Sequence, residues 1–129
     1  MNINRMRLSK KEDARGWLVE NESQIVKDSM KHFLFSVSKP NVIRGQHYHK
    51  RKTEWFLVVK GKALIVFEDI NNSERKSIEV DGERAEIIEM PPMLAHAIKN
   101  IGDDDLYLMA IVNEPLDRKD PDTFSYKVI

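Results

Sequence analysis

Short apolar segments separated by turn residues constrain the fold of this chain more than any other feature. Each segment is rich in Val, Ile, Phe and Leu and has about the length of one β-strand. The segments cover residues 31–38, 54–60, 62–69, 84–89 and 105–113. Helical periodicity is scarce between them, and the spacing leaves no room for crossover helices. The pattern therefore predicts an all-β fold, either a sandwich or a barrel.

The residues between these segments predict where the chain reverses direction. Residues 60–62, Lys-Gly-Lys, separate two strand-like runs and predict a tight hairpin. Residues 71–73, Asn-Asn-Ser, and residues 81–82, Asp-Gly, predict two further reversals. The two prolines at 91–92 cannot both lie inside a central strand, so we expect them to lead into a strand that begins near Ala95.

Size and charge limit the functions open to this chain. Its 129 residues have a composition typical of one ordinary domain, so we expect a single domain over residues 1–129 that folds without a metal or a disulfide. Equal numbers of basic and acidic residues, 21 of each, give no general attraction to nucleic acid. The absence of cysteine excludes thiol nucleophiles and cysteine-rich zinc sites.

No segment predicts a leader or a membrane span. The charged residues 1–11 are not followed by an apolar stretch, and the longest apolar run, residues 106–112, is too short to cross a bilayer. We therefore expect a soluble, cytoplasmic protein that does not bind membranes.

The run from Glu54 to Val59 is apolar on both faces of the expected strand. Glu54, Phe56 and Val58 share one face, while Trp55 and the residues that alternate with it share the other. A small barrel buries only one of these faces in its interior. The other face is covered either by the chain's own terminal strands or by a second subunit, and the latter predicts a homodimer.

Three histidines and one glutamate form the candidate site. His47 and His49 lie two residues apart on an expected strand and therefore point to the same side. After four intervening residues Glu54 begins the next strand, and His96 follows the prolines where a later strand can deliver it to the same pocket. Such a set suits zinc above all, or Fe, Mn, Ni or Co, with positions left for water or substrate.

The apolar residues that follow Glu54 make burial of its carboxylate costly unless a cation or a proton accompanies it. This cost favours a divalent transition metal held by all four side chains. The alternative is a metal-free pocket in which the same histidines act as acid and base.

The spacing resembles the two motifs of the cupin family. In this chain the first motif takes the form G-x-H-x-H-x4-E-x6-G from Gly45 to Gly61, and the second is echoed by Pro91, His96 and Asn100. Gly45 lies closer to the histidines than the family's first glycine does, and Met93 replaces the glycine of the second motif. The resemblance implies a jelly-roll barrel, also called a double-stranded β-helix.

Longer stretches resemble particular cupins. The strings RGQHYHKRKTEWFLVVKGKALIVFE, PPMLAHAIKNIGD and NEPLDRKDPDTF are similar to the C-terminal cupin domain of capsular-polysaccharide assembly enzymes that remodel UDP-linked deoxysugars. Residues 13–16, Asp-Ala-Arg-Gly, resemble the opening of the dTDP-4-keto-6-deoxyhexose epimerases and ketoisomerases. The resemblance implies a C3 epimerase or 3,4-ketoisomerase of a nucleotide-linked 4-keto sugar, with a separate nucleotide-sugar reductase as a candidate partner.

That chemistry needs a base, a proton donor and a grip on the diphosphate. Lys52 is the candidate base if the strand of Glu54 begins early, and Tyr107 is the candidate donor. Arg15 and Arg44 are candidate diphosphate ligands, because guanidinium groups match phosphate oxygens.

Two other classes of function stay open at this point. Small cupins also act as non-catalytic sugar-binding or regulatory modules. Others are metal-dependent dioxygenases or isomerases of small molecules that use the same ligand set.

Overall fold

The computed structural model describes residues 1–21 and 24–129. The strands in the first half of the chain are β1 (Arg5–Arg7), β2 (Ser9–Asp13), β3 (Gly16–Glu20), β4 (His32–Ser38), β5 (Ile43–Tyr48) and β6 (Glu54–Lys60). Those in the second half are β7 (Lys62–Asp69), β8 (Arg75–Asp81), β9 (Glu86–Met90), β10 (Leu94–Asn100), β11 (Leu106–Val112) and β12 (Phe124–Ser125). A short helix, α1 (Gln24–Ser29), precedes β4, and a 3-10 turn, Gly82–Arg84, precedes β9.

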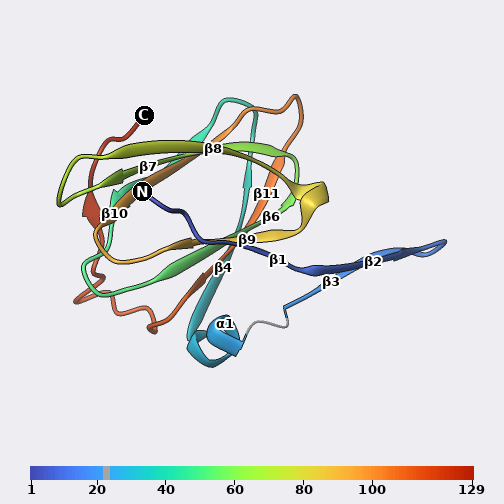
Figure 1. Ribbon diagram of the computed structural model, residues 1–129, viewed down its shortest axis with the longest axis horizontal. Helices are drawn as coiled ribbons and strands as arrows, with labels where there is room; N and C mark the ends of the chain where they lie inside the picture. The colour runs from blue at the N-terminus through green and yellow to red at the C-terminus, as the bar shows by residue number, and fades with distance from the viewer. Residues whose placement is uncertain (22–23) are drawn as a thin grey trace.

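Two five-stranded antiparallel sheets face each other and form the barrel (Figure 1). One sheet has the order β1-β9-β6-β11-β4 and the other the order β12-β5-β10-β7-β8. From β5 onward the chain passes repeatedly from one sheet to the other, and this connectivity is that of a jelly roll. The all-β prediction and the cupin-type barrel are confirmed.

The main core fills the space between the two sheets. Phe56 and Val58 of β6 point into it, together with Ile65 and Phe67 of β7, and all four are buried. Strands β9, β10 and β11 supply most of the remaining core side chains: Ile88, Met90, Leu94, Ile98, Leu106, Leu108 and Ala110. Burial of this interior holds the two sheets, and therefore the strands that carry the candidate site, at fixed positions.

Most of the expected strands form where their composition predicts them. The runs at 54–60 and 62–69 are confirmed as β6 and β7, and the expected start near Ala95 lies within β10. The run expected at 84–89 begins later, at Glu86, because the preceding 3-10 turn ends on Ala85 in a left-handed conformation. Strand β8 and the hairpin of β2 and β3 carry too many charged residues to stand out as apolar runs.

The predicted tight hairpin at residues 60–62 is wrong. Strand β6 pairs with β11 and β9, whereas β7 pairs with β10 and β8, so the two strands that flank Gly61 belong to different sheets. Gly61 has a φ angle of 106°, and a Cβ there would lie 3.2 Å from the carbonyl oxygen of Asp105. The glycine therefore forms a corner at which the chain changes sheet.

The reversal expected at residues 71–73 is confirmed as a hairpin between β7 and β8. The flanking residues Glu68 and Arg75 pair across it, and Ser73 donates its backbone N–H to the carbonyl oxygen of Asp69. Ser73 adopts a positive φ angle of 61° at this turn.

The outer face of the first sheet is covered in part by the chain itself. Trp55 is buried beneath side chains that include Met6 of β1 and Leu8, so the terminal strands supply part of the cover that the sequence requires. The cover ends toward β4, an edge strand whose Phe33, Phe35 and Val37 are exposed. The hairpin of β2 and β3 extends away from the barrel (Figure 1).

Among the residues that the structure describes, no helix is long and apolar enough to cross a membrane.

Candidate functional site

Strands β5 and β10 of one sheet and strand β6 of the other bring the predicted site residues together. His47 on β5 lies directly opposite His96 on β10 in the antiparallel register. His49 follows the end of β5, and Glu54 is the first residue of β6. The backbone N–H of Met93 donates to the carbonyl oxygen of His49 at 2.7 Å, so the turn before β10 holds the chain at His49.

A β-bulge in β5 sets the position of His47. Gly45 and Gln46 both have positive φ angles, 90° and 57°, and the pairing of β5 with β10 shifts by one residue next to His96. Such a bulge turns the following side chain relative to the regular alternation of a strand. A Cβ at Gly45 would lie 2.9 Å from the carbonyl oxygen of His96, so only glycine allows this close approach.

The second motif forms its turn without glycine. Met93 takes the left-handed conformation, with a φ angle of 67°, at the position where the family usually has Gly. This conformation costs an L-residue about 1–2 kcal/mol. His96 nevertheless reaches the site.

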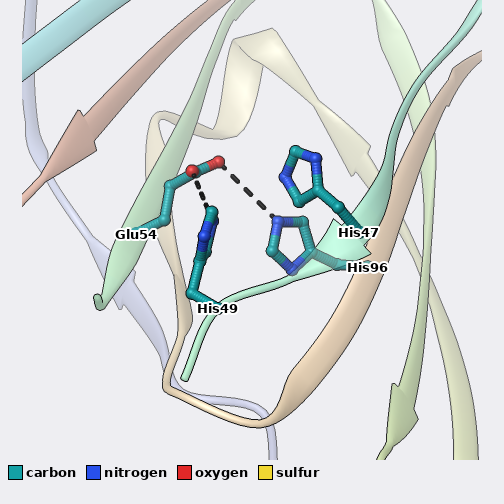
Figure 2. A group of neighbouring side chains, drawn as sticks. All are labelled: His47, His49, Glu54 and His96. Carbon is teal, nitrogen blue, oxygen red and sulfur yellow. Dashed lines mark hydrogen bonds and ion pairs between the residues drawn. The ribbon is translucent and has the colours of Figure 1, made fainter. Parts of the chain in front are cut away.

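The four side chains converge inside one end of the barrel (Figure 2). Their candidate ligand atoms all lie within 4.8 Å of one another. Glu54 faces the histidines: one carboxylate oxygen lies 3.2 Å from Nε2 of His49, and the other lies 3.7 Å from Nε2 of His96. His96 is fully buried, and His49 and Glu54 are 5% and 7% exposed.

The backbone determines which nitrogen of two histidines faces the site. Nδ1 of His49 lies 2.7 Å from the carbonyl oxygen of Asp122, and Nδ1 of His96 lies 2.9 Å from that of Leu94. A carbonyl oxygen only accepts, so each Nδ1 carries a proton and each Nε2 points to the site. Histidines that bind metals commonly have this arrangement, because the bond fixes the tautomer and the ring orientation.

Two buried nitrogen atoms in the site lack a hydrogen-bond partner within the described residues. They are Nε2 of His47 and Nε2 of His96. A buried polar atom without a partner costs free energy, so such atoms usually mark a site at which something else binds.

Burial and the contacts within the cluster shift the pKa values of its side chains in different directions. Burial alone would raise the pKa of Glu54, but its contacts with His49 and His96 hold it well below the usual value. Burial lowers the pKa of His49, yet its hydrogen bonds to Glu54 and to the Asp122 carbonyl outweigh this effect and raise the pKa. Burial and the neighbouring His96 lower the pKa of His47 to about 4.

The donor set therefore fits a divalent cation. At neutral pH Glu54 is ionised and His47 is neutral with a free lone pair. The cluster offers three imidazole nitrogens and one carboxylate, and two of these nitrogens are the buried atoms without a partner. Zinc and its neighbours in the transition series prefer such ligands.

Of the other predicted residues, Lys52 lies in the loop beside the cluster, and Tyr107 lies outside the barrel. Strand β6 begins at Glu54, so the expected alternation does not extend back to Lys52, whose ammonium donates to the carbonyl oxygen of Pro121 at 2.9 Å. Tyr107 packs against Phe35 on the outer face of the sheet. The structure does not bring Tyr107 to the four side chains.

The two predicted diphosphate ligands also lie apart from each other. Arg44 connects the edges of the two sheets: its Nε donates to Oγ of Ser38 at 2.7 Å, and a terminal nitrogen donates to the Val37 carbonyl. Arg15 lies at the tip of the projecting hairpin, where its side chain is 90% exposed and paired with Asp13.

Sequence reasoning missed Asp122, which is 3% exposed and contacts the loop between His49 and Glu54. Nothing in the local pattern of residues 117–123 separates it from the other aspartates there.

Asn100 of the second motif has a structural role, because its amide nitrogen donates to the carbonyl oxygens of Ser38 and Asp104.

Comparison with known proteins identifies the family. A model of the polysaccharide biosynthesis C-terminal domain matches residues 11–124. The chain belongs to this family. Within the polysaccharide biosynthesis C-terminal domain family, a relative is the UDP-2-acetamido-2,6-beta-L-arabino-hexul-4-ose reductase of Pseudomonas aeruginosa, which is 45% identical over 96 residues. That match covers 74% of this chain and 26% of the relative, so the chain spans about a quarter of its length.

Solved structures share the fold. The capsular polysaccharide assembling protein CapF of Staphylococcus aureus is 34% identical with a TM-score of 0.74, over 94% of this chain and 34% of CapF. The 3,4-ketoisomerase QdtA of Thermoanaerobacterium thermosaccharolyticum is 18% identical with a TM-score of 0.80, over 95% of this chain and 86% of QdtA. The dTDP-4-dehydrorhamnose 3,5-epimerase of Sulfolobus tokodaii is 20% identical with a TM-score of 0.82, over 98% and 77%.

Proposed function

We propose that this polysaccharide biosynthesis C-terminal domain is an isomerase of nucleotide-linked 4-keto-6-deoxyhexoses. The observation that carries the proposal is the buried group of three histidines and one glutamate, in which two nitrogens have no partner among the described residues. The family description supports a place in polysaccharide biosynthesis. The solved QdtA holds TDP-4-keto-6-deoxyglucose, which supports the substrate class.

The chemistry that we propose is proton transfer next to a ketone. The proton on C3 of a 4-keto sugar is acidic because the resulting anion delocalises into the carbonyl group. Catalysis needs a base at C3 and positive charge or hydrogen bonds at the carbonyl oxygen. Return of the proton to the other face of C3 gives an epimer, while its return to C4, after a shift between the oxygens, gives the 3-keto isomer.

The four clustered side chains take the electrophilic role in this proposal. A divalent cation, zinc in the first instance, held by His47, His49, Glu54 and His96 would supply positive charge for the carbonyl oxygen. The buried Glu54 balances that charge, and the Nδ1–H bonds of His49 and His96 keep both rings aimed at the cation. In the metal-free alternative, the same histidines act as acid and base, and the hydrogen bond between His49 and Glu54 supports that role.

Lys52 remains the candidate base, as the buried amine in the loop between His49 and Glu54. Its bond to the Pro121 carbonyl has to break before its amine can reach a substrate. Arg44 and Arg15 remain the candidate diphosphate ligands. Because Arg15 lies in the turn of the β2–β3 hairpin, which extends away from the barrel (Figure 1), we expect it to reach a bound nucleotide in an assembly of copies.

We also propose that the chain forms a homodimer through the outer face of β4. The exposed Phe33, Phe35 and Val37 extend the buried cluster around Trp55 to the edge of the sheet, which supports an interface there.

The reductase name of the Pseudomonas relative supports a nucleotide-sugar reductase as the enzyme that receives the keto product. A cytoplasmic location stays a prediction from the sequence.

Isotope exchange tests the proposed reaction directly. The metal-loaded protein is incubated in deuterated water with UDP-linked and dTDP-linked 4-keto-6-deoxyhexoses, and NMR follows deuterium at C3. We expect incorporation that depends on the protein and on at least one of these nucleotides. Binding of the sugars without any exchange would contradict the proposal and favour a non-catalytic sugar-binding domain.

A further inference from the structure

Residues 121–129, which we call segment 121–129, run alongside the strand that carries His47. Phe124 and Ser125 form β12 and pair with Tyr48 and His47 of β5. The N–H of Tyr126 then donates to the carbonyl oxygen of Gln46, within the β-bulge, at 2.8 Å. The segment therefore lies directly behind the candidate site.

The far end of segment 121–129 is anchored by side chains from the barrel. The amide of Gln46 accepts from the N–H groups of Val128 and Ile129 and donates to the carbonyl oxygen of Ile129. The hydroxyl of Tyr126 donates to Glu68, and Arg75 donates to both Glu68 and the carbonyl oxygen of Val128. These bonds fix the segment independently of its contacts with the site.

Asp122 connects this anchored segment to the loop between His49 and Glu54. Its carboxylate accepts the three consecutive backbone N–H groups of Lys50, Arg51 and Lys52 at 3.0, 2.9 and 2.9 Å. The side chain is 3% exposed, and the backbone holds a left-handed φ angle of 50°. A buried carboxylate that accepts three backbone bonds is a strong local constraint on the loop.

The backbone of Asp122 contacts the site through His49. Its carbonyl oxygen lies 2.7 Å from Nδ1 of His49, on the ring edge opposite Glu54. The carboxylate bonds hold Asp122 against residues 50–52, and this placement brings its carbonyl oxygen to the imidazole. One residue therefore sets both the loop that joins two cluster members and the tautomer of one of them.

We infer that Asp122 is a positioning residue that holds Nδ1 of His49 and so keeps Nε2 of this ring aimed at the cation site. The inference rests on the proposed function only in taking the four-residue cluster as a cation site. Outer partners of this kind typically change metal affinity by about 10–100-fold when they are removed.

Two Asp→Asn variants form a matched pair for the test. In Asp122→Asn the amide keeps the shape and tolerates the left-handed backbone, but its NH2 group opposes the N–H donors of the loop. Asp120→Asn makes the same chemical change two residues earlier, at an exposed aspartate whose side chain pairs with Arg51. Titration with Co²⁺, followed by its visible absorption, reports the affinity of the whole chain for the cation.

We expect Asp122→Asn to bind Co²⁺ at least about 10-fold more weakly than the wild-type protein, and Asp120→Asn to bind it equally well. In the metal-free proteins, long-range ¹H–¹⁵N NMR is expected to show a proton on Nδ1 of His49 in the wild type and in Asp120→Asn. The same spectra are expected to show that Nδ1 of His49 is no longer uniformly protonated in Asp122→Asn.

Unchanged Co²⁺ affinity in a folded Asp122→Asn protein would overturn the inference. If that variant fails to fold, the wild-type spectrum decides alone, because an unprotonated Nδ1 of His49 in the metal-free protein contradicts the role of the Asp122 carbonyl. Neither measurement depends on isotope exchange. Failure of the proposed reaction is therefore distinguishable from failure of this inference.

Discussion

His96 is the member of the cluster that is completely buried, and its ring packs edge-on against Phe56 and His47. Its Nε2 has no hydrogen-bond partner within the described part of the chain, and a bound cation would give its lone pair a partner. This residue therefore gives the sharpest mutational test of the electrophile.

We predict that His96→Ala lowers the rate of deuterium exchange at C3 by about 100-fold or more, which corresponds to about 3 kcal/mol of transition-state stabilisation. The matched control is His32→Ala, which removes the histidine of β4 outside the cluster and should leave the rate unchanged. Exchange by His96→Ala at the wild-type rate would assign catalysis to a metal-free acid and base.

At the scale of the element, segment 121–129 is sensitive to alkaline pH through Tyr126. Its hydroxyl donates to Glu68, and this bond raises the pKa of Tyr126 above its usual value near 10. The folded state therefore holds this proton more tightly than the unfolded state. The stability that the bond contributes is complete below pH 10 and is lost as pH rises through the raised pKa.

We predict that the wild-type protein loses more stability than Tyr126→Phe when the pH rises from 8 to 11. Other groups, such as the lysines, titrate alike in both proteins, so the difference between them isolates Tyr126. Thermal melts followed by circular dichroism at the two pH values measure it. An equal loss in both proteins would show that the Tyr126–Glu68 bond does not hold the segment in solution.

Strand positions were predictable from the sequence, but strand partners were not. The bounds of β6 and β7 follow from local composition and from Gly61, whereas the corner between them depends on pairing with β11 and β10, which lie far along the chain. The same distinction applies to the site. His47, His49, Glu54 and His96 were predictable from spacing, but Asp122 acts through contacts with residues about seventy positions earlier.

At the scale of the whole molecule, cation binding is expected to raise stability because only the folded barrel assembles the four ligands. We predict that Zn²⁺ or Co²⁺ at 100 times its dissociation constant stabilises the protein by about 2.7 kcal/mol. For a chain of this size that corresponds to a rise in melting temperature of roughly 10 °C.

Elemental analysis of protein purified without a histidine tag provides the second half of that test. Less than about a tenth of an equivalent of any transition metal, together with no rise in melting temperature on metal addition, would contradict a cation site.

The exposed face of β4 gives a prediction about assembly. Phe35 is 54% exposed, so Phe35→Lys should leave the barrel folded while it places charge in the proposed interface. We predict that sedimentation shows a dimer for the wild type and a monomer for this variant. Leu116→Lys, at a similarly exposed loop residue, is the control and should remain dimeric. A monomeric wild type at micromolar concentration would refute the interface.

The bonds between Asp122 and residues 50–52 also set an order of events during synthesis. They join parts of the chain that are 70 to 72 positions apart. A ribosome releases all of the strands that carry the four ligands before it releases Asp122. A nascent barrel can therefore close around its core while His49 still lacks its backbone partner, and the site acquires its final geometry only when the last strand, β12, pairs with β5.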